Sequence, residues 1–389
     1  MNDARIEWNE GGEQRAARWR SEAGVPPPKR VQVVDDTLSA NAAFRLASEG
    51  TSLLWRSDFH NARQLLQAMA RRADRKPRNA QVPASPAEAF HLHRQAQGQR
   101  SRTLGRLLIA LEGDYGIALP RAPDLRQACI EAWGPADGQP SVASLRELLG
   151  LVGAHEWRKK GVEIPALGAP PDNRIHPHYG VFSPVRGEYL ELVAKAPLPT
   201  RELAFDIGTG TGVLAAILAR RGVQRVIATD QDARALACAR ENIARLHLQR
   251  TVEVLEADLF PSDAAPLVVC NPPWLPARPS SPLEHAIYDE GSHMLRGFIA
   301  GLAAHLTAAG EGWLILSDLA EHLGLRSRDE LLALFEAGAL RVLERRDIRP
   351  RHPKASDERD ALHLARAKEV TSLWRLASNA VGTQAPAQA

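Results

Sequence analysis

The spacing of apolar positions changes character near residue 164 of the chain. Before that point, apolar residues recur every three to four positions, as on one face of a helix. This spacing predicts helices over residues 57–74, 104–111, 125–133 and 142–152, separated by Gly- and Pro-containing breaks. Ser57 or Asp58 can cap the first of them. The pattern predicts a small all-α domain over residues 31–163.

The segments on either side of this domain have a different composition. Residues 1–30 are polar, carry few aliphatic side chains and end in PPPK, which predicts a flexible N-terminal tail. Residues 164–177 contain PALGAPPD, and a Pro- and Gly-rich stretch of this kind is typical of a linker between domains. Residues 381–389 are expected to form a flexible C-terminal tail.

From residue 178 to residue 380, short apolar runs alternate with helical patterns. Buried strands are predicted over residues 202–208, 225–230, 252–260, 267–271 and 312–318, with helices over 212–220, 232–246 and 293–308. A last helix over 328–337 precedes RVLERR and VTSLWRLA, which can close the sheet at its edge. This alternation predicts an α/β fold with a doubly wound parallel sheet, whose ligands bind at the carboxyl ends of the strands.

Composition is that of a globular chain of more than one domain. The 389 residues are 44% apolar and 24% charged. The three cysteines are far apart, and the His residues are not clustered at ligand spacing, so we expect neither disulfides nor a metal site. The N-terminus lacks the apolar core of a signal peptide, and no run is long enough to span a membrane. These features predict a cytoplasmic protein.

Positive charge is concentrated between residues 56 and 106. This stretch holds eleven Arg and Lys against three acidic residues, a surplus of eight positive charges in a chain whose net charge is +3. One interpretation is an ordinary solvated helical face. The other is a surface that attracts RNA phosphates or the ribosome.

A glycine-rich loop follows the first strand of the C-terminal part. The sequence there is Asp206-Ile-Gly208-Thr209-Gly210-Thr-Gly212, and the next strand ends in Asp230. Glycines allow a tight turn and a close approach of the backbone to a ligand, and a carboxylate after the second strand can accept hydrogen bonds from ribose hydroxyls. The pattern predicts an adenosine-containing ligand. The GxGxG spacing and the acidic residue before it argue against a nicotinamide dinucleotide. A nicotinamide-dependent enzyme and a catalytically silent cofactor-binding module stay remote alternatives.

The fourth strand ends abruptly in Asn271-Pro272-Pro273-Trp274. A Pro-Pro pair cannot continue a central strand, and it stiffens the corner. The oxygen of Asn271 and the carbonyl of Pro272 can hold the two N–H bonds of a planar nitrogen, while Trp274 can stack on a flat substrate. The alternative is an Asn-Pro turn with Trp274 in the core. After an adenosine-type loop, we favour the catalytic interpretation for these four residues.

The motifs DxGxGxG, Asp230, ADLF (257–260) and NPPW (271–274) resemble those of the class I S-adenosylmethionine-dependent methyltransferases over residues 175–378. The resemblance implies a Rossmann-like sheet of seven strands and S-adenosylmethionine as cofactor. It also implies that the methionine part of the cofactor is surrounded by the first loop, namely Asp206, Gly208, Thr209, Gly210 and Gly212. By the same resemblance, Asp230 holds the ribose and Asp258 meets the adenine amino group. Asn271 would border the cofactor. By itself, Asp258 could equally be a turn residue.

Residues 206–276 are similar to the HemK-type protein-glutamine N5-methyltransferases, except that Trp274 stands where those enzymes mostly have tyrosine. The likeness implies methylation of a glutamine in a release factor or a ribosomal protein. NPP-aromatic motifs also occur in enzymes that methylate adenine N6 or guanine N2, so methylation of an rRNA or tRNA base is the alternative. The segment 176–189 resembles the part that covers the cofactor in these enzymes. Tyr179, Phe182, Arg186 and Trp274 are candidate substrate contacts there, unless the first three merely pack.

Overall fold

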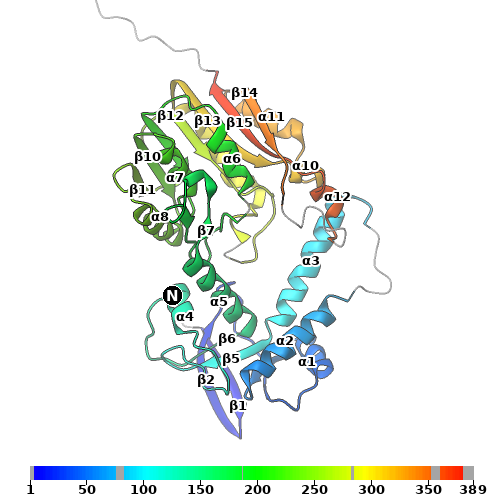
Figure 1. The fold of residues 1–389 in the computed structure, drawn as a ribbon. Coiled ribbons are helices and arrows are strands. Elements are labelled where there is room, and N and C mark those ends of the chain that lie inside the picture. Colours follow the sequence, from blue (N-terminus) through cyan, green and yellow to red (C-terminus); the bar gives the residue numbers. More distant parts are fainter. Residues whose placement is uncertain (1–3, 76–82, 186, 282–283, 352–359, 380–389) are drawn as a thin grey trace, which may run out of the picture. The chain divides into compact units, whose positions relative to one another are not determined.

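The computed structural model describes residues 4–75, 83–185, 187–281, 284–351 and 360–379 (Figure 1). The chain divides into two compact units, each of which is described by itself. The N-terminal unit comprises residues 1–84 and 91–156, and the C-terminal unit comprises residues 85–90 and 157–389.

The N-terminal unit contains a sheet of six strands in the order β1-β2-β6-β5-β4-β3. The strands are β1 (Arg5–Glu10), β2 (Glu13–Arg20), β3 (Val31–Val34), β4 (Ser52–Trp55), β5 (Leu107–Leu111) and β6 (Ser141–Ser144). Strands β3, β4 and β5 run parallel, and β6 is antiparallel to β5. The helices are α1 (Ala40–Ser48), α2 (Phe59–Ala73), α4 (Arg126–Trp133), and most of α3 (Pro86–Leu104) and α5 (Leu145–Lys160).

The predicted flexible tail of residues 1–30 is wrong, because it contains the hairpin of β1 and β2. Ile6 and Trp8 alternate with charged or polar residues in β1, and both are buried. Gly11 and Gly12 make the turn with φ angles of 63° and 87°, as a two-residue hairpin requires. Polar composition hid a period-two pattern that places only one face of the strand in the core.

The predicted all-α character of residues 31–163 is also wrong. Short, mostly buried runs such as LLIAL of β5 form strands, and periodicity alone cannot separate such a run from a buried helical turn. The helix expected over 104–111 is therefore the end of α3 followed by β5. The helix expected over 57–74 is confirmed as α2, where the side chain of Asp58 caps the N-terminus by accepting from His60 and Asn61.

The C-terminal unit contains a sheet of seven strands in the order β11-β10-β9-β12-β13-β15-β14. The strands are β9 (Leu203–Ile207), β10 (Arg225–Asp230), β11 (Val252–Glu256), β12 (Ala265–Cys270), β13 (Leu306–Ser317), β14 (Leu340–Ile348) and β15 (Thr371–Ser378). The first five run parallel, and β15 is antiparallel to both of its neighbours. The predicted doubly wound sheet is confirmed, as is its closure by the last two strands.

Helices cover both faces of this sheet (Figure 1). One face packs against α6 (Glu188–Lys195), α7 (Val213–Arg220) and α8 (Ala233–Arg245), and the other against α9 (His293–Leu302) and α11 (Arg328–Ala337). Alternate residues of β9 face opposite ways: Ala204 lies in the first core and Phe205 in the second. The short helices α10 (Leu319–His322) and α12 (His363–Arg366) pack together in a third cluster.

The predicted linker over residues 164–177 is wrong, because these residues pack into the C-terminal unit. They include the turn Pro165–Leu167 and strand β8 (Arg174–Ile175), which pairs with β7 (Val162–Glu163). Ile164, Leu167 and Ile175 are buried in the same core as α7. The helix expected over 293–308 ends at Leu302, because β13 begins at Leu306. In the described residues, no helix combines the length and the apolar character that crossing a bilayer requires.

Candidate functional site

Three predicted site residues lie side by side where neighbouring parallel strands end. In the register of the sheet, Ile207 of β9 pairs with Thr229 of β10 on one side and with Cys270 of β12 on the other. The residues that follow are Gly208, Asp230 and Asn271. Because paired strands lie about 4.8 Å apart, the glycine loop has Asp230 on one flank and Asn271 on the other. The strand order reverses between β9 and β12, which is where open α/β sheets bind ligands.

Asp206 is a fully buried carboxyl under the glycine loop. Its Oδ2 accepts hydrogen bonds from the Thr209 hydroxyl (2.7 Å) and from the backbone N–H of Ala215 (3.0 Å). Its Oδ1 is buried and has no hydrogen-bond partner among the described residues. Burial raises the pKa of Asp206 to about 6, against the opposing effect of these two hydrogen bonds. A buried acceptor of this kind is costly unless a donor or a cation completes it.

The glycine loop is held in shape by β10. All three of Gly208, Gly210 and Gly212 have positive φ angles, of 69°, 55° and 79°. The backbone N–H of Gly210 donates to Oδ2 of Asp230 at 3.0 Å, and that of Thr209 donates to the carbonyl of Thr229 at 2.8 Å. Burial raises the pKa of Asp230. Asp230 therefore orients the loop as well as standing beside it.

Asp258 lies just beyond β11 and is exposed. The preceding residue, Ala257, donates its backbone N–H to the carbonyl of Asp230 at 3.1 Å, so the two acidic residues border the same edge. Leu259 has a φ of 66°, and its carbonyl accepts from the Thr229 hydroxyl at 2.6 Å. These bonds fix the turn that carries Asp258.

The NPPW corner is closed by a hydrogen bond within itself. The indole N–H of Trp274 donates to Oδ1 of Asn271 at 2.9 Å. Pro272 is buried and Pro273 is half-buried. Trp274 packs against both cores of the unit and meets the ring of Tyr189 edge-on, with 6.5 Å between ring centroids and 89° between planes. Tyr189, on α6, is itself buried, and burial together with the charge of Asp206 raises its pKa.

Of the three candidates between residues 176 and 189, two lie in described parts of the chain. Tyr179 is half-buried under the guanidinium of Arg234, 5.7 Å from the ring centroid. Phe182 packs against the core that contains α7. Arg186 lies outside the described residues. The segment is tied to α8 by His178, whose Nε2 lies 2.7 Å from Oε2 of Glu241.

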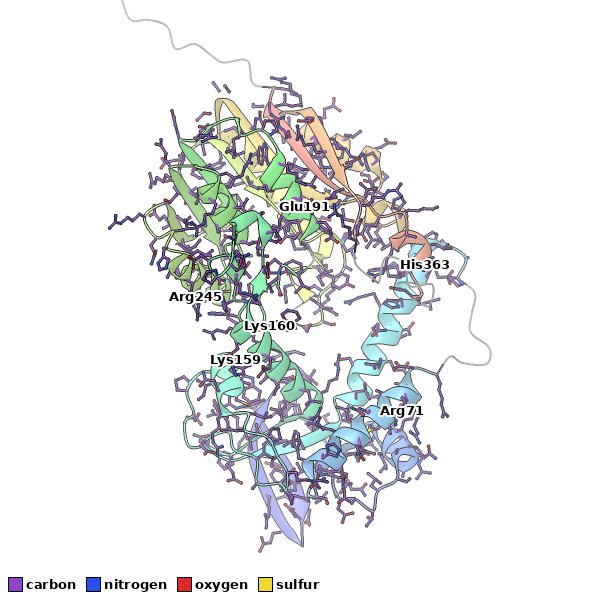
Figure 2. All side chains as sticks on the ribbon, in the orientation of Figure 1. Arg71, Lys159, Lys160, Glu191, Arg245 and His363 are labelled. Atoms are coloured by element: carbon purple, nitrogen blue, oxygen red, sulfur yellow. The ribbon has the colours of Figure 1, made fainter. Side chains whose placement is uncertain are left out.

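Glu241 carries several of these ties. Burial by itself would raise its pKa, but hydrogen bonds from Arg245, His178 and Arg158 outweigh burial and lower the pKa to about 2. Arg245 lies on α8 one turn beyond Glu241 (Figure 2). Glu241 is therefore ionised whenever this segment is docked at neutral pH.

Two side chains that the sequence analysis missed also shape the site. Asn242 is fully buried in α8, and its Nδ2 donates to the carbonyl of Thr211 in the glycine loop at 3.1 Å. Met294, at the start of α9, lies over Gly208: a Cβ added to that glycine would come within 2.3 Å of the Met294 methyl carbon. A polar residue at a core-facing position of the helix was the available signal for Asn242. Met294 gave none, because a methionine at helical spacing is ordinary core.

These residues fit an adenosyl sulfonium cofactor with an amino-acid tail. Oδ1 of Asp206 supplies an unused acceptor for a cationic group, and the space beside Gly210 is open, since an added Cβ there meets nothing within 4 Å. Among the described residues, no cluster of three or more His, Cys, Asp or Glu side chains could hold a metal ion.

Residues 172–336 match the family model described as "Methyltransferase small domain". This confirms the predicted class I methyltransferase domain and, with it, S-adenosylmethionine as the cofactor. The match leaves out the N-terminal unit altogether.

Curated relatives with similar sequences act on components of translation. The release factor glutamine methyltransferase of Caulobacter vibrioides is 35% identical over 152 residues, which cover 37% of this chain and 53% of that protein. The tRNA1(Val) (adenine(37)-N6)-methyltransferase of Aeromonas salmonicida is 34% identical over 131 residues, covering 32% and 56%. The chain thus spans about half the length of the curated relatives it matches.

Among solved structures, a ribosomal protein L11 methylase from Lactobacillus delbrueckii subsp. bulgaricus is 15% identical, with a TM-score of 0.37 over 55% of this chain and 90% of that one. The strand order of the sheet and the family match show the fold.

Proposed function

We propose that this protein transfers a methyl group from S-adenosylmethionine to a planar nitrogen, because residues 172–336 match the methyltransferase small domain. The proposed acceptor is the side-chain amide of a glutamine in a release factor or ribosomal protein. The observation that carries the proposal is the register that sets Asn271 beside the glycine loop at the carboxyl edge of the sheet. The similarity to the release factor glutamine methyltransferase supports the choice of acceptor.

The proposed cofactor site uses residues on the β9 and β10 side of that edge. Asp206 offers its free carboxylate oxygen to the methionine ammonium. The loop around this group is formed by Gly208, Thr209, Gly210 and Gly212. Asp230 accepts hydrogen bonds from the ribose hydroxyls. Asp258 borders the adenine. When bound, S-adenosylmethionine supplies an electrophilic methyl group on a sulfonium.

The proposed acceptor site is the NPPW corner. An amide nitrogen is a poor nucleophile because its lone pair is delocalised into the carbonyl. Oδ1 of Asn271 and the backbone carbonyl of Pro272 hold the two N–H bonds, so that the lone pair can turn toward the methyl carbon. As the new C–N bond forms, the S–C bond breaks, and the nitrogen then loses a proton to water. Alignment can account for about 7–11 kcal/mol of the barrier. No strong base is needed, because the nitrogen becomes acidic once it carries the methyl group.

Methylation of an RNA base is a second candidate, favoured by the similarity to the tRNA adenine methyltransferase. The charges of the N-terminal unit support it less than their number suggests. Arg56 pairs with Glu10 (2.8 Å), Arg100 pairs with Asp74 (2.7 Å), and Arg72 bonds to Asn41 (2.7 Å). Arg63, Arg71, Arg75 and Arg102 remain exposed.

Transfer of tritium from labelled S-adenosylmethionine into an extract of cells lacking the enzyme tests the proposal. We expect the label in protein, removed by protease and resistant to ribonuclease. Label removed by ribonuclease would establish the RNA candidate instead. If no label is transferred to either polymer, the proposed function is wrong.

The role of Asn271 is tested by Asn271→Ala. Turnover should fall by several orders of magnitude, because one of the two acceptors for the substrate N–H bonds is lost, while calorimetry should find cofactor affinity within a few-fold of the wild type. Full activity of this variant would exclude the role assigned to Asn271.

A further inference from the structure

We propose that Trp274 is a positioning residue, whose indole N–H fixes the carboxamide of Asn271 so that its oxygen faces the acceptor nitrogen. This inference rests on the proposed function and goes beyond it, because Trp274 then acts through Asn271 rather than as a stacking surface. The observation is the hydrogen bond from Nε1 of Trp274 to Oδ1 of Asn271, at 2.9 Å.

A carboxamide needs such a lock because its two ends are nearly the same in shape and opposite in function. One end is an acceptor with two lone pairs, and the other is an NH2 donor. If the Asn271 amide turns by 180°, the NH2 faces the N–H of the acceptor, and two donors meet. The side chain contributes to alignment only in one of its two orientations.

The indole N–H selects the productive orientation because it is a donor and cannot accept. The atom of Asn271 that faces it is therefore the oxygen. That oxygen has a second lone pair, which stays available for the substrate N–H. A flipped Asn271 would lose the indole bond and set its own NH2 against the indole N–H.

The indole can act as a lock because it is itself fixed. Trp274 follows two prolines, packs against both cores of the unit, and meets Tyr189 edge-on. Tyr189 is only 4% exposed. A ring held on these sides keeps its N–H direction, whereas a ring on an open loop would turn with the substrate.

A change of one atom distinguishes the positioning of Asn271 by the indole N–H from stacking of the ring on the substrate. Replacing Trp274 by 3-benzothienylalanine keeps the bicyclic aromatic ring and its volume but puts sulfur where the N–H was. We expect kcat for tritium transfer into the extract to fall at least tenfold, with KM for the extract and the calorimetric Kd for S-adenosylmethionine within about twofold of the wild type. The same replacement at Trp157, which is 45% exposed, is the matched control and should leave kcat unchanged.

If kcat of the Trp274 variant stays within twofold of the wild type, the positioning role is overturned. If wild-type protein itself transfers no label, the proposed function fails, which is a different outcome. The hydrogen bond has its own readout that needs no turnover. In protein with 15N-labelled tryptophan, the indole resonance of Trp274, assigned by its loss in Trp274→Phe, should shift and exchange faster with solvent in Asn271→Ala. An unchanged resonance would also overturn the inference.

Discussion

The side chain of Asn242 accepts a hydrogen bond from the backbone N–H of His176 at 2.7 Å. Its Nδ2 lies 3.3 Å from the carbonyl of the same residue and 3.1 Å from that of Thr211. One buried amide thus joins the segment that begins at His176 to the glycine loop, and it does so from within α8. The segment with Tyr179 and Phe182 is therefore docked through backbone groups as well as through the side chain of His178.

From this geometry, Asn242→Ala should lower the free energy of unfolding by about 1–3 kcal/mol, because it removes the amide that bonds to the backbone N–H of His176 and to the carbonyl of Thr211. Cofactor affinity should fall as well, since the loop loses an anchor. Urea unfolding and calorimetry measure the two effects. Asn9→Ala is the control: Asn9 is exposed and accepts one surface bond from Gly12, so its loss should cost less than about 1 kcal/mol. Equal effects of the two substitutions would contradict the anchoring role.

The contribution of Asp206 to the stability of the folded protein depends on pH, and the sign of this dependence follows from its raised pKa. Its pKa is about 6 in the folded protein, against 3.8 for an ordinary aspartate. Between these values the folded protein binds a proton that the unfolded chain has released, so stability falls as pH rises through this window. Above pH 6 the full cost, about 3 kcal/mol, is present.

Asp206→Asn should remove this cost and leave the unliganded protein more stable at pH 7 by about 1–3 kcal/mol. The gain should shrink on going from pH 7 to pH 4. The variant should bind S-adenosylmethionine more weakly, because the negative charge facing the ammonium is gone. Unfolding curves at both pH values and calorimetry at pH 7 check this. A stability gain that does not vary with pH would show that the carboxyl is not the source of the cost.

The strands of the C-terminal unit that carry the site were predictable because β9, β10 and β12 are largely buried apolar runs. Strand ends at Ile207, Asp230 and Cys270 follow from Gly, Asp and Pro residues that break the pattern. The N-terminal sheet was missed for two physical reasons. In β1 the buried positions are only Ile6 and Trp8, which stand between charged or polar residues, and in β5 an apolar run has no period at all.

Within the site, the residues of the loop and the corner were identified from their order along the chain. The bond from Trp274 to Asn271 could not be, since it depends on a side-chain rotamer. The same holds for Met294 over Gly208, because these residues are brought together by the return of α9 to the sheet edge. Sequence spacing located the backbone of the site, and the packing around it came only with the structure.

The contact of Met294 with Gly208 predicts the cost of a methyl group in the loop. Gly208→Ala should destabilise the protein by more than Gly210→Ala, because both positions have positive φ but only the Cβ of residue 208 meets a neighbour, the methyl carbon of Met294. We expect about 1 kcal/mol for Gly210→Ala from backbone strain, and about 2 kcal/mol or more for Gly208→Ala. Thermal unfolding of the unliganded proteins measures the difference.

The Met294→Ala substitution removes the clashing methyl group. In that background, the extra loss of stability caused by Gly208→Ala should largely vanish, so that only the cost of backbone strain remains. If it persists there, the contact with Met294 is not its cause.

Charge reversal on the N-terminal unit distinguishes the two candidate acceptors. Arg71 lies on α2 (Figure 2), and Arg63 and Arg75 are exposed beside it in sequence. If the acceptor is a protein, replacing all three by Glu should leave the binding of bulk tRNA as weak and as salt-dependent as in the wild type. If RNA is the acceptor, affinity should fall, and the slope of log K against log salt should drop by about one for each phosphate that the variant no longer neutralises.

Reversal of Arg250, Arg341 and Arg349, exposed residues of the C-terminal unit, is the control for net charge. Fluorescence anisotropy across a series of salt concentrations gives both quantities. We expect both triple variants to bind alike, because a protein acceptor gives neither set of arginines a phosphate to neutralise. A weakening confined to the first triple would favour the RNA base over the glutamine amide.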